Sequence, residues 1–347
     1  MILLAVPMAE IGQYAPHATL PDMTRCTVRE EYNTGVFEVT IDYPIAGDNA
    51  EMIANGNALI IDTPGRSTAQ LFVISRVSRP VSGVISATAQ HISYLYSSVM
   101  CKPFLNGGQH WPAAVALQKC LTAAVNPIPY AQISCDITDT TLADVGIHAT
   151  VPTSLRKILY DQIAPAFGAE IKVDNVNITV TKEQHRQSGA VLAYAKNIVS
   201  GSTDAETAKI ESGIFAYYGD AADSAKGYVD TGAVIDYELG LPYNIISVDL
   251  TKNFESLPNT KQLIAAANAY KARRIAEIAP ASLKIDFVPD GTIILPGDIA
   301  KVKLYGAAAE DRIVTATTYD ALSRRVTSVE FGNQAQNDLA KIIASLR

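Results

Sequence analysis

Two stretches near opposite ends of the sequence repeat one pattern of strands and turns, and this repeat constrains the fold more than any single element does. Residues 40–44 resemble residues 284–289, and the turn at 55–57 resembles the turn at 296–298. Three pairs of positions share a nearly constant spacing: Asp42 with Asp286, Gly56 with Gly297, and Ile74 with Val314. Self-similarity at a nearly fixed offset is typical of two copies of one supersecondary unit. The alternative is a chance match between short strand-turn patterns.

The strand signal is clearest at 37–43. Phe37, Val39, Ile41 and Tyr43 alternate with polar residues, which is the period-two pattern of a strand with one wet face. Strand patterns separated by turn residues continue to about residue 90 and return after residue 190. We therefore expect a small antiparallel β domain near each end of the chain.

Between these domains the hydrophobic period becomes helical. Apolar residues recur at helical spacing over 112–127 and over 153–165, with Thr153 or Ser154 as a cap and Pro165 as the end of the second helix. A hairpin is expected at 171–180, with Asp174 and Asn175 as its two-residue turn. This turn would place Val173 opposite Val176.

Two further helices are expected towards the carboxyl end. Asn259 and Gln262 are spaced as a capping box at the start of a helix that Pro280 terminates. The last segment is amphipathic, with apolar residues on one face: Leu339, Ile342, Ile343 and Leu346.

These patterns predict an α+β, multidomain fold with two similar antiparallel β-barrel-like domains and intervening helix and hairpin units. A length of 347 residues agrees with two to four domains at roughly 100–200 residues each. The expected units are a first β domain (1–95), a helix and hairpin domain (96–185), a second β domain (186–255 with 281–333), an inserted helix (256–280) and a terminal helix (334–347).

Composition excludes several classes of protein. Hydrophobic residues make up 48% of the chain, which is globular and argues against disorder. The chain has 28 Lys and Arg against 35 Asp and Glu, a formal net charge of −7. Because binding to DNA relies on positive charge that neutralises phosphates, sequence-specific nucleic acid binding is not expected.

The sequence also predicts a soluble chain without a membrane partner. No apolar run approaches the roughly 20 residues of a membrane-spanning helix, and residues 1–8 lack the basic region of a secretory signal. Four cysteines without a CxxC pair, namely Cys26, Cys101, Cys120 and Cys135, are typical of reduced, partly buried residues.

Motifs that carry chemistry are missing from the sequence. It contains no HExxH, GxSxG, GxxxxGK[ST] or GxGxxG, so we expect no enzyme activity, no cofactor, and no catalytic or metal-binding residues. The five histidines are scattered: His17, His91, His110, His148 and His185. Two minority alternatives stay open, a Cys101 nucleophile near His110 and the carboxylate pair Asp220 and Asp223 in an Ala- and Gly-rich loop.

A family resemblance extends over nearly the whole chain. Six segments carry it in order: 29–35, 70–74, 89–95, 194–198, 295–298 and 329–333. In this order they resemble phage tail hub and minor structural proteins, a group that includes the prophage endopeptidase tail and the amino-terminal module of tail-associated lysins. The carboxyl end differs, because many of these proteins carry an appended wall-cleaving or fibre-like region and only a short helix is expected here after Asn333.

The resemblance implies a structural role in a virion tail. It implies the baseplate hub fold, in which two similar β domains per chain of a homotrimer form a ring of six that joins the tail tube to the tip. The expected location is the virion tail tip, after synthesis in the cytoplasm of the host bacterium. The implied partners are a distal tail or tail tube protein, the tape-measure protein and a receptor-binding or fibre protein, with DNA passing through the ring.

Two other functions stay open from the sequence. One is a tail-associated peptidoglycan hydrolase, or endopeptidase, which would require converging titratable groups in one cleft. The other is a carbohydrate-binding adhesin, which would display aromatic side chains, whereas the single Trp111 lies at an expected helix start.

Overall fold

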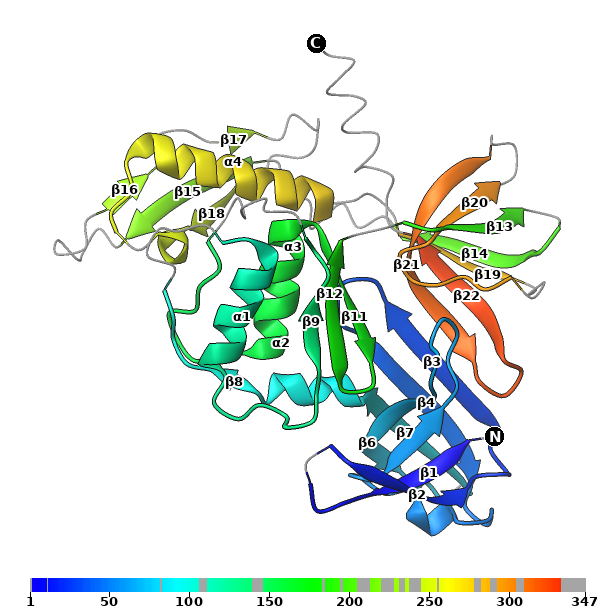
Figure 1. Ribbon diagram of the computed structural model, residues 1–347. Helices are drawn as coiled ribbons and strands as arrows, with labels where there is room; N and C mark the ends of the chain where they lie inside the picture. The colour runs from blue at the N-terminus through cyan, green and yellow to red at the C-terminus, as the bar shows by residue number, and fades with distance from the viewer. Residues whose placement is uncertain are drawn as a thin grey trace.

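The chain is described here from a computed structural model, and β-strands dominate it (Figure 1). The structure describes residues 2–10, 12–81, 83–105, 111–138, 146–182, 185–193, 196–204, 213–219, 228–230, 235–236, 245–254, 256–277, 282–287, 292–303 and 309–331. The expected terminal helix (339–346) and Pro280 lie outside these residues. In the described part of the chain, 13 strands form one mainly antiparallel sheet.

The first part of this sheet comes from the amino-terminal quarter of the chain. Its strands and one short 3-10 helix are β1 (Leu3–Pro7), β2 (Tyr14–Thr19), β3 (Arg25–Glu31), β4 (Phe37–Pro44), η1 (Ala50–Met52), β5 (Ala58–Ile61), β6 (Gln70–Ser78) and β7 (Val84–His91). The alternation at 37–43 gives β4, whose apolar side chains are buried while their neighbours are half-buried. We call strands β3 to β7 repeat 1.

The second part comes from the carboxyl-terminal half. Its strands are β13 (Gln187–Ala193), β14 (Ile198–Asp204), β19 (Ser282–Phe287), β20 (Ile299–Lys303), β21 (Glu310–Asp320) and β22 (Arg325–Phe331). We call β14 together with β19 to β22 repeat 2. Figure 1 shows the two repeats as adjoining parts of one twisted sheet, with β3 beside β21 where they meet.

The two repeats pair their strands in the same order. In repeat 1, β3 pairs with β4, β4 with β7, β7 with β6, and β6 with β5. In repeat 2, β14 pairs with β19, β19 with β22, β22 with β21, and β21 with β20. All eight pairings are antiparallel. The strand outside β5 differs, because β1 pairs antiparallel with β5 whereas β13 pairs parallel with β20.

One register and one irregularity match between the repeats, whereas β21 has a second shift on β22, between Thr318 and Tyr319, that β6 lacks. Asp42 lies opposite Ser86, and Asp286 lies opposite Ser328. The register of β6 on β7 shifts around Ser75 and that of β21 on β22 around Thr315. Both hydroxyls donate to the neighbouring strand, Ser75 Oγ to Thr88 O (3.2 Å) and Thr315 Oγ1 to Glu330 O (3.1 Å). The spacing between Ile74 and Val314 that the sequence shows therefore relates β6 to β21.

The sheet does not close. No closed barrel is found among the described strands, and β14 and β2 lie at opposite ends of the strand order. The sequence predicted barrel-like domains, and the open sheet corrects this prediction. The physical reason is that β21 pairs with β3, which joins the two repeats edge to edge into one open sheet.

A middle unit, residues 92–182, packs against repeat 1. Its elements are η2 (Ile92–Ser97), β8 (Met100–Cys101), α1 (Ala113–Ala123), β9 (Ile133–Cys135), β10 (Thr153–Ser154), α2 (Leu155–Ile158), η3 (Leu159–Ile163), α3 (Ala164–Phe167), β11 (Ala169–Asp174) and β12 (Asn177–Lys182). Apolar side chains of this unit and of both repeats form one continuous core.

The hairpin of the middle unit exists, but its register differs by two residues from the expected one. Val173 lies opposite Ile178 and Asp174 opposite Asn177, so that Asn175 and Val176 form the turn. Asn175 adopts a left-handed φ of 52°, which Asn tolerates better than most residues. A shift of two residues keeps the same apolar face buried.

The sequence suggested that Pro165 ends the second helix, but the helix continues past this residue. The helix that Ser154 caps by accepting from the Lys157 amide continues through a π-helical turn (η3) and α3 to Phe167. Pro165 lies in the first turn of α3, after this wider turn, where a missing amide hydrogen is tolerated. Gly168, at a φ of 52°, terminates the helix instead.

An inserted unit, residues 213–277, interrupts repeat 2 between β14 and β19. Its elements are β15 (Gly213–Gly219), β16 (Tyr228–Asp230), β17 (Ile235–Asp236), β18 (Ile245–Asp249), η5 (Thr251–Asn253) and α4 (Thr260–Glu277). The capping box forms: the Asn259 amide donates to Gln262 Oε1 (2.9 Å) and the Gln262 amide to Asn259 Oδ1 (3.0 Å). These strands pair with one another, not with residues 281–333, which the sequence grouped with them.

Candidate functional site

Among the described strands, one pair joins the two repeats into a single sheet. We call the pairing of β21 with β3 the internal junction. It runs antiparallel from Ala316 opposite Glu31 to Asp320 opposite Thr27. One more hydrogen bond flanks each end, from Tyr32 N to Thr315 O (2.8 Å) and from Ala321 N to Cys26 O (2.9 Å). The contact therefore extends one position beyond the paired residues at both ends.

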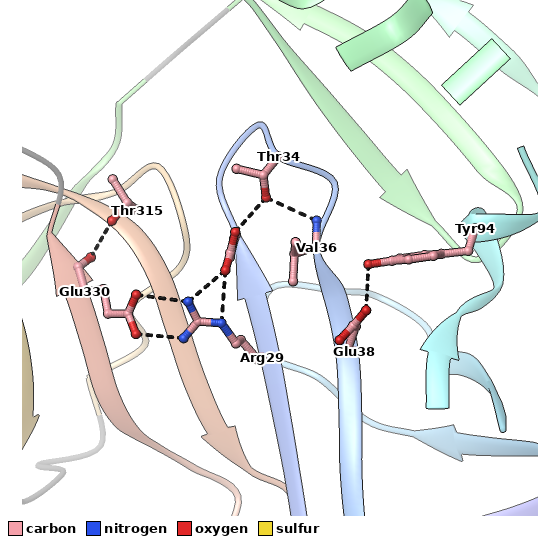
Figure 2. A network of polar contacts seen from close by, with 8 residues as sticks. Arg29, Thr34, Val36, Glu38, Tyr94, Thr315 and Glu330 are labelled. Atoms are coloured by element: carbon pink, nitrogen blue, oxygen red, sulfur yellow. Dashed lines mark hydrogen bonds and ion pairs between the residues drawn. The ribbon is translucent and has the colours of Figure 1, made fainter. Parts of the chain in front are cut away.

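Arg29 crosses the internal junction (Figure 2). Its guanidinium donates to both carboxylate oxygens of Glu330 (2.7 and 2.9 Å) and to Glu31 (2.7 and 3.0 Å). Thr34 Oγ1 donates to the other oxygen of Glu31 (2.9 Å). The hydrogen bond that Arg29 donates to Glu330 raises the pKa of Arg29, and the same bond lowers the pKa of Glu330. Charge-assisted bidentate pairs of this kind fix geometry as well as adding attraction.

A small hydrophobic contact extends the internal junction beyond the strands. The turn between β21 and β22 carries Ala321 and Leu322, which line a pocket of about 260 Å³ together with Ile2, Leu20 and Pro21. Ala321 packs against the main core. The tip of repeat 2 therefore packs on the segment that leads into repeat 1.

A second pocket, of about 240 Å³, lies where repeat 1, the middle unit and repeat 2 meet. Its lining includes charges of both signs: Glu30, Arg66, Glu170, Lys172, Arg186 and Asp298. Arg66 forms an ion pair with Glu30, and Arg186 forms one with Asp298 (2.6 Å). Burial raises the pKa of Glu30, and the Arg66 charge opposes this rise. Because these ion pairs form within the chain, the pocket is best interpreted as a structural seam between units.

Tyr94 ties the middle unit to repeat 1 beside the internal junction. Figure 2 shows its hydroxyl directed at Glu38, to which it donates a 3.1 Å hydrogen bond. Burial raises the pKa of Tyr94 to about 12, and the neighbouring Glu38 charge adds to this shift. The Arg156 guanidinium lies over the Tyr94 ring at 4.3 Å from its centre and also donates to Gly35 O (2.8 Å).

The candidates for chemistry do not converge in the described part of the chain. The Cys101 thiol is fully buried and its pKa is raised by burial, which disfavours the reactive thiolate. His110, Asp220 and Asp223 lie outside the described residues. No group of three or more His, Cys, Asp or Glu side chains that could hold a metal ion occurs among the described residues.

The remaining histidines and Trp111 have separate surroundings. His91 is buried in repeat 1, His17 is exposed on β2, His148 Nδ1 lies 3.0 Å from Gly146 O, and His185 Nδ1 lies 2.8 Å from Gly297 O. Trp111 is half-buried at the start of α1, where Lys119 lies over its ring. No helix of the described chain has the length and apolar character needed to span a membrane.

Sequence reasoning did not identify the internal junction. Thr27 and Asp320 lie near opposite ends of the chain, and a pairing at such a distance leaves no local periodicity to read. Segment 29–35 contributed to the family resemblance without a role for Arg29. The repeat itself is the signal that could have found the contact, because two similar open β units in one chain each present strand edges that require a partner.

Comparison with solved structures places the fold among phage tail proteins. No family model and no curated protein matches the sequence. A tail protein from Neisseria meningitidis MC58 aligns with a TM-score of 0.62 and 12% identity, over 96% of this chain and 97% of that one. The 43 kDa tail protein of prophage MuSo2 from Shewanella oneidensis aligns with a TM-score of 0.62 and 13% identity, over 96% of this chain and 98% of that one.

Prophage tail protein gp18 from Listeria monocytogenes EGD-e aligns with a TM-score of 0.56 and 12% identity, over 99% of this chain and 98% of that one. Nearly the whole length is thus shared with each of these three structures, including both repeats and the units between them. The resemblance to phage tail proteins that the sequence indicated is confirmed at the level of the fold.

Proposed function

We propose that this chain is a structural component of a phage or prophage tail tip or baseplate hub, where it forms a ring that joins the tail tube to the tip and lets DNA pass. The observation that carries the proposal is the internal junction. One chain already joins two β units of equal strand order edge to edge through β21 and β3. Adding further units by the same kind of contact extends the sheet around an axis.

The proposed ring contains three chains and six β units. Two repeats per chain, each a copy of one domain, match a threefold tip to a sixfold tube, as the family resemblance implies. Closed symmetric assembly also removes exposed strand edges that would otherwise aggregate. The net charge of −7 suits an axial passage, because an acidic surface does not retain DNA.

In the proposed tail the ring contacts a distal tail or tail tube protein on one side. Its axial passage admits DNA and the tape-measure protein, and a receptor-binding or fibre protein is a further partner. The shared fold supports a location in the virion tail, and the proposed ring specifies the tip.

The oligomeric mass and the shape of the purified protein test this function. We expect light scattering to give three times the chain mass of 37.1 kDa, and electron microscopy to show rings with an axial hole. A twofold pair of chains, or a ring to which each chain contributes only one β unit, would contradict the proposal.

The proposed role is structural and not enzymatic. We expect purified protein to release no fragments from peptidoglycan, since Cys101 is buried and no candidate cluster forms among the described residues. Fragment release that disappears in Asp220→Asn or in Cys101→Ser would support the hydrolase alternative instead.

A further inference from the structure

The two repeats do not present the same contacts, although they pair their strands alike. Repeat 2 contributes β21 to the internal junction, and repeat 1 contributes β3. By the matched registers, β6 is the counterpart of β21, and β14 is the counterpart of β3. In the described part of the chain, neither counterpart has a strand in the corresponding place.

The open edge of β6 lies at its carboxyl end. β5 pairs with β6 only over residues 70–73, and the bonds between Ile74 and the turn before β5 extend this edge by one residue. From Arg76 to Ser78 the described strands pair with β6 only from the side of β7. The same stretch of β21, from Ala316 onward, is the part that binds β3.

The open edge of β14 lies at one end of the whole sheet. Its described partner is β19, and the opposite edge of β3 in repeat 1 carries the internal junction. Val199 on β14 has 70% of its surface exposed. A paired strand with an open, partly apolar edge is a template for a further strand.

The turn that follows β6 carries an exposed apolar side chain. Val81 is fully exposed, and Ile45 and Val84 next to it are exposed as well. Val81 lies three residues after Ser78, as Ala321 lies three residues after Thr318, and Ala321 packs half-buried on the core at the internal junction. Ala321 is thus half-buried at the internal junction, whereas Val81 is exposed where no junction forms within the chain.

We infer that the edge of β6 and its following turn bind the edge of β14 of a second copy of this chain, in the register of the internal junction. The inference rests on the proposed ring and specifies its intermolecular contact. Each copy then offers one β6 edge and one β14 edge. Such a head-to-tail contact closes into a ring when the rotation permits.

The internal junction fixes the expected register. Arg25 lies opposite Asp42 in repeat 1, and Ser200 lies opposite the equivalent Asp286 in repeat 2. Four residues further along each strand, Arg29 therefore has Asp204 as its counterpart. Arg29 lies opposite Thr318, whose counterpart is Ser78. Ser78 of one copy therefore pairs with Asp204 of the next, and Val81 lies opposite Gly201.

Pro80 fits this register. Its counterpart Asp320 lies opposite Thr27, one position from the bonded pair of Ala321 and Cys26. Bonded and non-bonded pairs alternate along antiparallel strands, so the amide at this position points away from the partner strand. A proline here loses no hydrogen bond of the proposed contact.

Disulfide trapping tests the register directly. The alternation of pairs makes Ser78 and Asp204 a non-hydrogen-bonded pair, whose β-carbons lie close enough to cross-link. We expect the double variant Ser78→Cys with Asp204→Cys to give covalent dimers and trimers under mild oxidation. Co-expressed single variants should give a covalent dimer of the two different chains, while each single variant alone should give none.

A variant out of register provides the matched control. Ser78→Cys with Ser202→Cys differs by two positions on β14, and we expect much weaker cross-linking. Equal cross-linking of both double variants would overturn the inferred register. Rings or trimers in which Ser78→Cys with Asp204→Cys does not cross-link would overturn the contact and leave the proposed function standing.

The remaining outcomes also separate the two proposals. A cross-linked pair that closes as a dimer would support the β6 to β14 contact and contradict the ring of three. A monomer at every concentration that never cross-links would contradict both.

A charge at the turn tests the apolar part of the contact. Val81→Glu should weaken self-association at least tenfold, because a carboxylate would be buried against the partner, and should leave the thermal transition of the single chain unchanged. Val151→Glu, on an exposed valine of the middle unit, should change neither. Equal association of the two variants would exclude the turn from the contact.

Discussion

At the residue scale, His91 is a buried titratable group within repeat 1. The ring is fully buried and stacks on Phe37, with its centre 4.4 Å from that of Phe37. Its nitrogens lie 2.9 Å from Ser93 Oγ and 3.1 Å from Gln70 Oε1. Burial lowers the pKa of His91 well below 6.5, and the Arg66 charge lowers it further. The imidazole therefore stays neutral in the folded protein over a range in which the unfolded chain binds a proton.

The first prediction follows from this difference in proton binding. Between pH 6.5 and the lowered pKa of His91 the unfolded state binds the extra proton, so the free energy of unfolding should fall as pH falls. The slope contributed by one group is at most about 1.4 kcal/mol per pH unit. Urea titrations of His91→Gln should lack this slope, while the exposed control His17→Gln should keep it. A wild-type protein with equal stability at pH 5 and pH 7 would contradict the prediction.

At the scale of the element, two equivalent turns differ in what surrounds their glycine. Gly56 and Gly297 precede β5 and β20 with φ angles of 90° and 88°. Each amide donates to the long neighbouring strand, Gly56 to Ile74 O (2.9 Å) and Gly297 to Val314 O (2.7 Å). A β-carbon added to Gly56 would meet open space, whereas one added to Gly297 would lie 2.5 Å from the Tyr32 ring.

The second prediction uses these turns as a matched pair. Gly56→Ala should lower the free energy of unfolding by about 1–2 kcal/mol, because a left-handed φ disfavours any residue with a β-carbon. Gly297→Ala should lower it by about 1–3 kcal/mol more, because it also displaces Tyr32 at the internal junction. Chemical denaturation of both variants measures the difference. Equal losses would show that Tyr32 moves aside freely.

Elements with strict periodicity could be predicted from the sequence, and those decided by contacts between units could not. The strand at 37–43 and the capping box at Asn259 are determined by residues within the element itself. The hairpin turn is displaced by one residue, and the strand register by two, because Asn175 bonds to repeat 1. Its side chain accepts from the Leu71 amide (2.9 Å) and its backbone amide donates to Gln70 Oε1 (2.9 Å). A local sequence pattern carries no information about contacts with residues 70–71, about 100 positions away.

At the scale of the whole molecule, the sequence contained the repeat but not its consequence. The nearly constant offset between the two stretches recurs in the strand pairing, yet it does not say which edges meet. The pairing of β21 with β3 opened the sheet that the sequence expected as barrels. The candidate site is this pairing: the repeat could indicate that strand edges require partners, but the choice of β21 and β3 required the structure.

The repeat also shows where the chain has been extended. In repeat 1, Arg29 lies opposite Glu38, and the short segment 30–37 connects them. In repeat 2 the equivalent pair is Asp204 and Ser282, and residues 205–281 connect them. The inserted unit within this segment has a hydrophobic core of its own, in which Ile214 on β15 and Leu263 on α4 are fully buried.

The third prediction is that this segment can be exchanged for the short connection of repeat 1. Replacing residues 205–281 by the sequence of residues 30–37 should leave the rest of the chain folded, because Asp204 and Ser282 already face each other and the removed core is separate. Circular dichroism should show a cooperative thermal transition, and hydrogen exchange should show protected amides in β3 and β21. As a control, replacing the middle unit, residues 92–182, by a short linker should unfold the chain, since this unit shares the main core with both repeats. Loss of protection in β3 and β21 after the first exchange would mean that the inserted unit supports repeat 2, and the two repeats would then not be equivalent folding units.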